Sequence, residues 1–189
     1  LQGICSAVEV QGNRAWFLNN RCEAVCVTVE GLRTEGAKNR GVTDEVYKGK
    51  GKADILWRHD MIEELGVFPH NLATSSSLIV GDLLYLVTGN GVDEGHLGIP
   101  SQTSPSVVAF NKNTGEWAWE FVVHDQVLHG QWSSCSAGLV KGKMQVFFPG
   151  GDGWMYGLDA KTGTLIWKFN CNPADSFWEL GGYGTKNNI

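Results

Sequence analysis

One eleven-residue phrase occurs twice in this chain, at 109–119 and again at 157–167. In each copy a small residue is followed five, six and ten positions later by Thr, Gly and Trp. These shared positions are Ala109, Thr114, Gly115 and Trp119 in the first copy and Gly157, Thr162, Gly163 and Trp167 in the second. The copies are 48 residues apart, a period typical of repeat proteins in which each unit is one small sheet. The repeat therefore predicts a series of similar sheets.

Each part of the phrase has a mechanical role. Asn111 or Asp159 ends a strand, and its side chain can bond the backbone two residues later to begin a turn. Gly115 or Gly163 supplies the positive φ that closes the turn. The next strand then returns to the Trp, whose ring removes a large apolar area from water when it is seated on a small residue.

The phrase resembles the repeat of the quinoprotein-type (PQQ-like) β-propellers, and the resemblance extends over most of the chain. In that family each Trp docks on a neighbouring blade and covers the small residue and the Thr-Gly peptide. The resemblance implies an all-β fold, a partial β-propeller of about three four-stranded blades in which Trp57, Trp119 and Trp167 dock. Three blades cannot close a ring of four to eight. We therefore expect part of a larger propeller of seven or eight blades, or a ring completed by other chains.

The hairpin signals assign blade one to residues 4–59, blade two to 71–123, blade three to 131–170 and the start of a further blade to 179–189. Polar insertions at 32–53 and 92–104 interrupt the first two blades, and the first is expected to be a mobile loop. Blade one is degenerate, with Thr28 at the turn, so its Trp57 is expected to pack less well than the other two. Between blades one and two, Asp60 and Gly66 bound a predicted short helix.

Composition excludes several classes of protein. The net charge is −5 over 189 residues, with no basic run outside one loop, which argues against a nucleic-acid partner. No apolar stretch approaches 18 residues, so no transmembrane segment is predicted. Because the chain begins at Leu1 without Met or a signal sequence, we expect a fragment or a processed form.

The five cysteines do not form a disulfide framework in a chain of this length. Cys22 and Cys26 lie four apart on a predicted strand, roughly 13 Å from each other, which is too far for a bond. We expect free core thiols rather than a bridge. A metal site at this pair would need further ligands, and none is near in the sequence.

Two histidines occupy similar positions when the blades are aligned on Gly12, Gly81 and Gly142. His70 and His129 each fall just before an innermost strand, and such strands line the central channel of a propeller. The candidate ligand-binding residues at this funnel are His70, Asn71, His129, Gln131 and Trp132. The alternative is that the histidines cap strands by bonding backbone groups.

The other sequence patterns give weaker evidence of a functional site. Asp93–His96 offers oxygen ligands of the kind calcium prefers, but it lacks the alternating spacing of a calcium loop, so a solvated loop is expected and no metal ligand is assigned. No Gly-x-Ser-x-Gly, paired-carboxylate or phosphate-loop pattern is present, so nucleophilic and phosphoryl chemistry have no support. The docking register assigns Trp57, Trp119 and Trp167 to the core, and Trp132 is the candidate aromatic residue that faces a ligand.

Two functions fit the resemblance. In the first, the chain is a binding or scaffold module, as in propeller lipoproteins of outer-membrane assembly, with the remaining blades or another protein as partner and no cofactor. In the second, it belongs to an alcohol or sugar dehydrogenase that holds pyrroloquinoline quinone and calcium. Such enzymes often carry adjacent cysteines, and no Cys-Cys pair occurs here. A propeller-based hydrolase or lyase is a third alternative. The resemblance implies an extracytoplasmic location, periplasmic or secreted.

Overall fold

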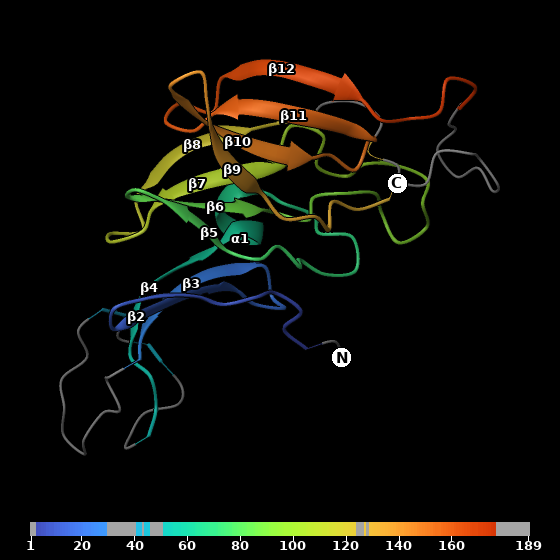
Figure 1. The fold of residues 1–189 in the computed structure, drawn as a ribbon. Coiled ribbons are helices and arrows are strands. Elements are labelled where there is room, and N and C mark those ends of the chain that lie inside the picture. The colour runs from blue at the N-terminus through green and yellow to red at the C-terminus, as the bar shows by residue number, and fades with distance from the viewer. Residues whose placement is uncertain are drawn as a thin grey trace.

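The computed structural model describes residues 3–29, 41–42, 44–45, 51–123, 127 and 129–176. Across these residues the chain forms three four-stranded antiparallel sheets, and the strands of each sheet are neighbours in sequence order. Figure 1 shows the sheets stacked in chain order, from the blue first blade to the orange third. The predicted all-β fold with three four-stranded blades is confirmed.

The first blade consists of β1 (Glu9–Gln11), β2 (Arg14–Leu18), β3 (Glu23–Thr28) and β4 (Ile55–Asp60). The second consists of β5 (Leu78–Val80), β6 (Leu83–Val87), β7 (Val107–Asn111) and β8 (Trp117–Phe121). The third consists of β9 (Ser136–Val140), β10 (Lys143–Pro149), β11 (Trp154–Asp159) and β12 (Leu165–Asn170).

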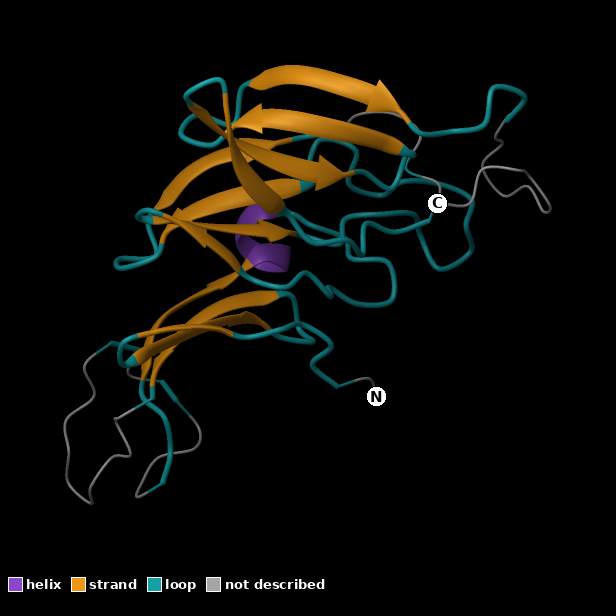
Figure 2. Ribbon diagram, viewed as in Figure 1, coloured by secondary structure: helices purple, strands orange, loops and turns teal. Residues whose placement is uncertain are grey.

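The predicted helix is present as α1 (Met61–Leu65), between β4 and β5. The Asp60 carboxylate caps its start by accepting hydrogen bonds from the backbone N–H groups of Ile62 and Glu63 at 3.0 and 3.2 Å. Gly66 ends the helix in the left-handed region, at φ 65°. Figure 2 shows this helix in purple, and its Met61 packs in the junction between the first and second sheets.

The turns of the repeated phrase form as the sequence predicts. Asn111 Oδ1 accepts from the backbone N–H of Asn113 at 2.9 Å, and Gly115 has φ 78°. In the second copy Asp159 Oδ1 accepts from the N–H of Lys161 at 2.9 Å, and Gly163 has φ 71°. An Asx bond at the first turn position and a left-handed glycine at the last therefore close both turns.

The core lies between the blades, because successive side chains of a strand point to opposite faces of its sheet. Leu84 and Leu86 of β6 pack against the first blade, with Trp16 and Leu18. The residues between and after them, Tyr85 and Val87, pack on the third blade instead. The buried residues on this second junction include Val107, Ala109, Trp119, Val146, Phe148, Tyr156, Leu158 and Ala160. The middle blade is therefore apolar on both faces.

The docking tryptophans seal these junctions. Trp119 stands opposite Ala109 in its own sheet, and its Nε1 donates to the carbonyl oxygen of Ala160 in the third blade at 3.1 Å. Trp57 stands opposite Cys26, and its Nε1 donates to the carbonyl oxygen of Lys112 in the second blade at 3.0 Å. Each ring covers the Thr-Gly turn of the next blade along the chain.

The expectation that Trp57 packs less well than Trp119 is wrong. Both rings are 7 % exposed. The seat of Trp57 is Gly115, where a Cβ atom would lie 2.8 Å from the ring. That glycine belongs to the intact phrase of the second blade, so the loss of the phrase from the first blade does not affect the fit.

Trp167 also differs from the expectation of an equivalent buried position, since it is 38 % exposed. It stands opposite Gly157, where a Cβ atom would lie 2.3 Å from the indole, and its Nε1 donates to Gln145 Oε1 at 3.0 Å. The small-residue contact inside the blade is therefore made. The outer face of the ring has no following blade among the described residues.

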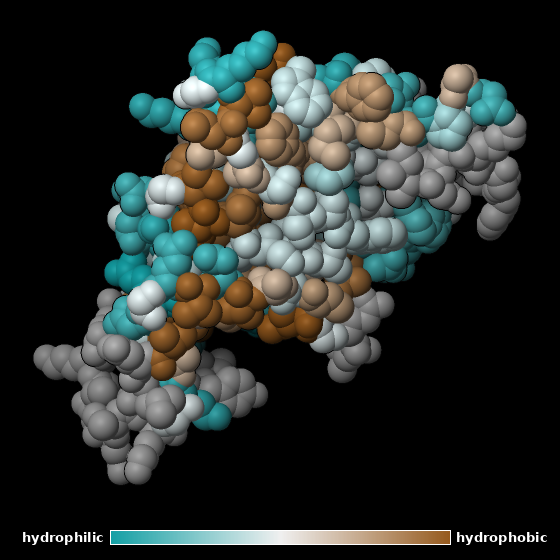
Figure 3. All heavy atoms as spheres, in the orientation of Figure 1, coloured by the Kyte–Doolittle hydropathy of each residue, from teal (hydrophilic) through white to brown (hydrophobic). Residues whose placement is uncertain are grey.

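Apolar surface is exposed on the blade edges, and Figure 3 shows it as a brown band that crosses the stack. Leu139 on β9 and Phe169 on β12 are 68 % and 65 % exposed.

Most of the insertion at 32–53 and all of 179–189 lie outside the described residues, so the expected mobile loop and the start of a further blade remain predictions. Among the helices of the described residues, none is long and apolar enough to cross a membrane.

All five cysteines are free, as predicted, but Cys5 and Cys171 are exposed rather than core thiols. Cys22, Cys26 and Cys135 are buried in the two junctions. Burial, with a smaller contribution from the Asp60 carboxylate, raises the pKa of Cys22 to about 12. Burial likewise raises the pKa of Cys135 to about 12. These thiols stay protonated at neutral pH, so they act as packing residues rather than nucleophiles.

Candidate functional site: a histidine cluster at the junction of blades two and three

The structure brings the two histidines of the sequence prediction into contact. His70 lies in the loop before β5 and His129 in the loop before β9, yet their ring centroids are 4.4 Å apart. His70 is 3 % exposed, whereas His129 is exposed. The similar place of each histidine in its blade is what sets them side by side, since neighbouring blades repeat the same path.

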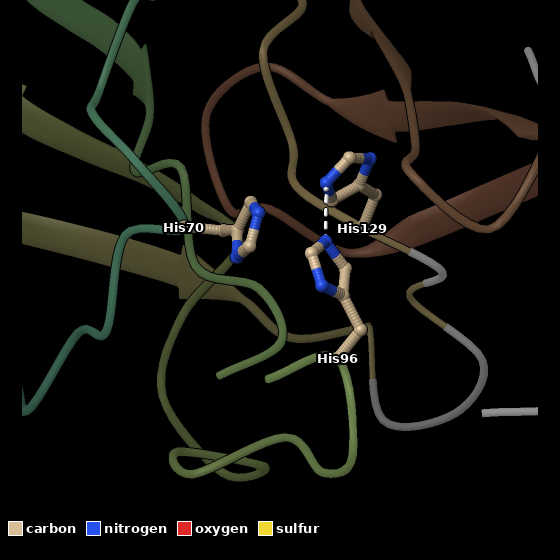
Figure 4. A group of neighbouring side chains, drawn as sticks. All are labelled: His70, His96 and His129. Carbon is tan, nitrogen blue, oxygen red and sulfur yellow. Dashed lines mark hydrogen bonds between the residues drawn. The ribbon is translucent and has the colours of Figure 1, made fainter. Parts of the chain in front are cut away.

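A third histidine, His96, completes the group. It comes from the 92–104 insertion, and its Nε2 lies 2.7 Å from Nε2 of His129. Its ring centroid is 4.8 Å from that of His70. Figure 4 shows the three rings pointing toward one another from three separate loops. We call His70, His96 and His129 the histidine cluster. Sequence alignment of the blades missed His96 because insertions have no counterpart in the repeat.

The backbone of Val92 connects two members of the cluster. Its carbonyl oxygen accepts a hydrogen bond from Nδ1 of His70 at 2.9 Å, and its N–H donates to the carbonyl oxygen of His129 at 2.9 Å. A carbonyl can only accept, so Nδ1 of His70 carries the proton. The Nε2 atom of a neutral His70 therefore has a free lone pair that faces the other two rings.

A tight turn positions His96. Its backbone N–H donates to the carbonyl oxygen of Asp93 at 3.0 Å, and it has the left-handed φ of 59°. Asp93 Oδ1 accepts from the N–H of Leu97 at 2.9 Å, and the N–H of Asp93 donates to the carbonyl oxygen of Gly98 at 2.8 Å. The segment expected to be a plain solvated loop is thus a closed turn that directs an imidazole into the cluster.

Trp132 lies beside the cluster and is 40 % exposed. Its ring centroid is 4.9 Å from that of His129, and its Nε1 donates to the carbonyl oxygen of His70 at 3.1 Å. Gly130 makes this placement possible, because a Cβ atom there would lie 2.5 Å from the indole. An accessible aromatic face therefore borders the imidazoles.

Gln131, another residue of the predicted site, lies beneath this surface. Gln131 is 1 % exposed, and its Nε2 donates to the carbonyl oxygen of Asn90 and to Ser106 Oγ, both at 2.9 Å. It ties loops together beneath the surface. Asn71 is an exposed turn residue with φ 63°, a conformation that Asn tolerates.

The electrostatics of the cluster favour the neutral form of His129. Burial, followed by the proximity of His70 and His96, lowers the pKa of His129. Positive charge on a neighbouring imidazole would repel a proton on His129, which opposes the protonation of His129. In the contact between His96 and His129, the Nε2 of one ring carries a proton and donates a hydrogen bond to the Nε2 of the other ring.

The cluster does not fit the calcium and quinone of the alternative function. It gathers nitrogen donors, whereas calcium takes oxygen ligands. One carboxylate of the same loop, that of Asp93, accepts a hydrogen bond from the N–H of Leu97, and among the described residues the group of possible metal ligands contains only the three histidines. The sequence also has no adjacent cysteine pair. No step through that cofactor is derived for these residues.

The fold defines the class of this chain: its described residues form three four-stranded blades of a β-propeller, and solved propellers with PQQ-like repeats are similar to it. BamB from Moraxella catarrhalis superimposes with a TM-score of 0.51 at 15 % identity, over 88 % of this chain and 37 % of that one. The quinohemoprotein alcohol dehydrogenase ADHIIG from Pseudomonas putida HK5 gives a TM-score of 0.53 at 16 % identity, over 90 % and 28 %. This chain thus spans well under half the length of both. No family model and no curated protein matches the sequence.

Proposed function

We propose that this chain is a binding module of a larger β-propeller protein, and that its ligand or partner docks at the surface formed by His96, His129 and Trp132. The observation that carries the proposal is the convergence of loops from two blades on one accessible patch of two imidazoles and an indole. Aromatic side chains dominate the energetics of many protein interfaces. Because their Nε2 atoms bond to each other, the two neutral imidazoles together add one donor and one acceptor through their Nδ1 atoms.

The remaining blades of the same propeller, or another protein, are the proposed structural partners. The half-exposed ring of Trp167 and the exposed apolar residues of β9 and β12 support this, because a further blade would cover them. The partial coverage of both propeller neighbours agrees with it. The proposal includes the extracytoplasmic location that the resemblance implies, which fractionation of cells that produce the full-length protein tests.

Site-specific photo-crosslinking in those cells tests the binding surface. A benzophenone amino acid replaces Trp132, and the matched control replaces Trp117, which is 52 % exposed on β8 outside the patch. We expect a crosslinked adduct from position 132 and none from 117. Equal adducts from both positions, or none from 132 in a protein with wild-type circular dichroism, would contradict the proposed surface.

A further inference from the structure

The histidine cluster has the composition of a metal site. One nitrogen from each ring lies within 4.8 Å of the others. Zn–N bonds of about 2.0–2.1 Å in a tetrahedral arrangement place ligand nitrogens roughly 3.3 Å apart. That separation lies between the 2.7 Å contact of His96 with His129 and the 4.8 Å limit of the group. Small side-chain movements would therefore bring all three nitrogens to a common ion.

His70 is oriented as a ligand rather than as a core residue. Histidines that bind metals almost always donate their other ring N–H to a carbonyl or a carboxylate, which fixes the tautomer. His70 makes this bond from Nδ1 to the carbonyl oxygen of Val92, so its Nε2 faces the cluster with a lone pair. It is also nearly fully buried, at 3 % exposure, so its ring has little freedom to turn away.

The backbone around the cluster allows a close approach. At Gly91 a Cβ atom would lie 2.4 Å from the carbonyl oxygen of His129 and 3.0 Å from Cβ of His70. Only glycine fits between the two loops without movement. The backbone C=O and N–H of the adjacent Val92 then form hydrogen bonds to His70 and His129, respectively. Three ligands from separate loops are thus held together by backbone contacts that do not involve the imidazole lone pairs.

We propose that His70, His96 and His129 bind one Zn²⁺ ion with a fourth coordination position open toward solvent and Trp132. Three histidines with an open position form a known zinc arrangement, and imidazole suits zinc well. When the ion binds, the ring that donates in the contact between His96 and His129 moves its proton to Nδ1, so neutral rings lose no proton overall. The inference rests on the proposed function in one respect: the open position would take a donor group of the docking partner.

Zinc titration of the untagged, chelator-treated full-length protein tests the ion directly and needs no partner. Isothermal calorimetry is expected to give one equivalent per chain with micromolar or tighter affinity. Co²⁺ in the same site is expected to give the visible absorption of a tetrahedral complex. His96→Ala and His129→Ala should each lower zinc affinity roughly 100-fold or more, beyond the usual effect of an outer-shell change.

Because His96 and His129 are exposed, their replacement should leave the fold intact, and His70→Gln serves as a third variant. His59→Ala is the matched control, since His59 lies on β4 outside the cluster. No stoichiometric zinc binding by the wild type, or unchanged affinity in both exposed variants, would overturn the proposal. Zinc binding without a crosslink at position 132 would keep the metal site and reject the proposed docking surface. A crosslink that persists in a protein without zinc affinity would keep the docking surface and reject the metal site.

Discussion

Trp119 of the second blade and Gly163 of the third are in such close contact that a Cβ atom at position 163 would lie 2.5 Å from the indole ring. Trp57 and Gly115 repeat this relationship one blade earlier, with a corresponding separation of 2.8 Å. Both glycines also have positive φ. Each is therefore needed for its backbone conformation and for the space it leaves.

We expect Gly163→Ala and Gly115→Ala to lower the free energy of unfolding by about 2–4 kcal/mol, because left-handed strain and overpacking act together. Gly142→Ala is the control, since Gly142 has φ 78° but no atom within 4 Å of the position that a Cβ atom would take. It should cost about 1–2 kcal/mol. Urea denaturation measures all three. Equal losses would show that the ring contact adds nothing.

We expect Trp57→Ala and Trp119→Ala to cost the same, about 3–5 kcal/mol, which is typical of a deleted core aromatic. The reason is that the two rings are equally buried. Trp167→Ala in the 189-residue chain should cost less, because more than a third of that residue's surface is already exposed. Unfolding by urea, followed by far-UV circular dichroism, ranks the three. A much smaller loss for Trp57→Ala would restore the view that its blade packs poorly.

The carboxyl of Asp152 predicts a dependence of stability on pH. Burial raises its pKa, and hydrogen bonds from the hydroxyl of Tyr156 and the N–H of Trp154 only partly oppose this. Because the folded pKa lies above the unfolded value of about 3.9, the contribution to stability is complete below that pH. It is lost as the pH rises through the folded pKa.

Asp152→Asn removes this titration. The stability of the wild type relative to Asp152→Asn should therefore fall when the pH is raised from about 4 to 7. Urea midpoints of the two proteins at matched pH values give the difference directly. A constant difference would mean that folding does not shift the pKa of this carboxyl, and a difference that rises with pH would mean that the folded state stabilises its charged form.

The approach of the two loops at Gly91 predicts a further effect on zinc. Gly91→Ala should push the backbone of His129 away and lower zinc affinity roughly 10- to 100-fold, as changes behind metal ligands usually do. Gly95→Ala is the control in the same insertion, because its Cβ would meet nothing closer than 3.4 Å. Calorimetric titration compares the two. Similar affinities in both variants would show that the loops can separate without disturbing the ligands.

The sequence was sufficient to predict the blades and their turns. Asn111, Asp159 and the two left-handed glycines bond or bend the chain only within their own turns. A short sequence motif is therefore enough to predict these turns. The pairing of His70 with His129 was also predictable, because both stand at one position of a repeat. The structure adds their actual contact.

The sequence predictions that failed concern contacts between different blades, insertions or loops. The packing of Trp57 depends on Gly115 of the next blade, so the degenerate phrase of its own blade was the wrong guide. His96 lies in an insertion, where the repeat gives no register from which its direction could be read. Gln131 was placed at a ligand surface because of its polarity, but its amide bonds to Asn90 and Ser106 in the interior.

The forward docking of each tryptophan gives the stack a direction. Trp57 is seated on the second blade and Trp119 on the third. Each stabilising contact therefore joins two successive sheets and does not lie within one blade. A cut made at a blade boundary would leave one ring without its seat and one seat without its ring. Shuffled or truncated propellers of this type should therefore be joined within a blade, after the Thr-Gly turn, where each tryptophan stays with the glycine that receives it.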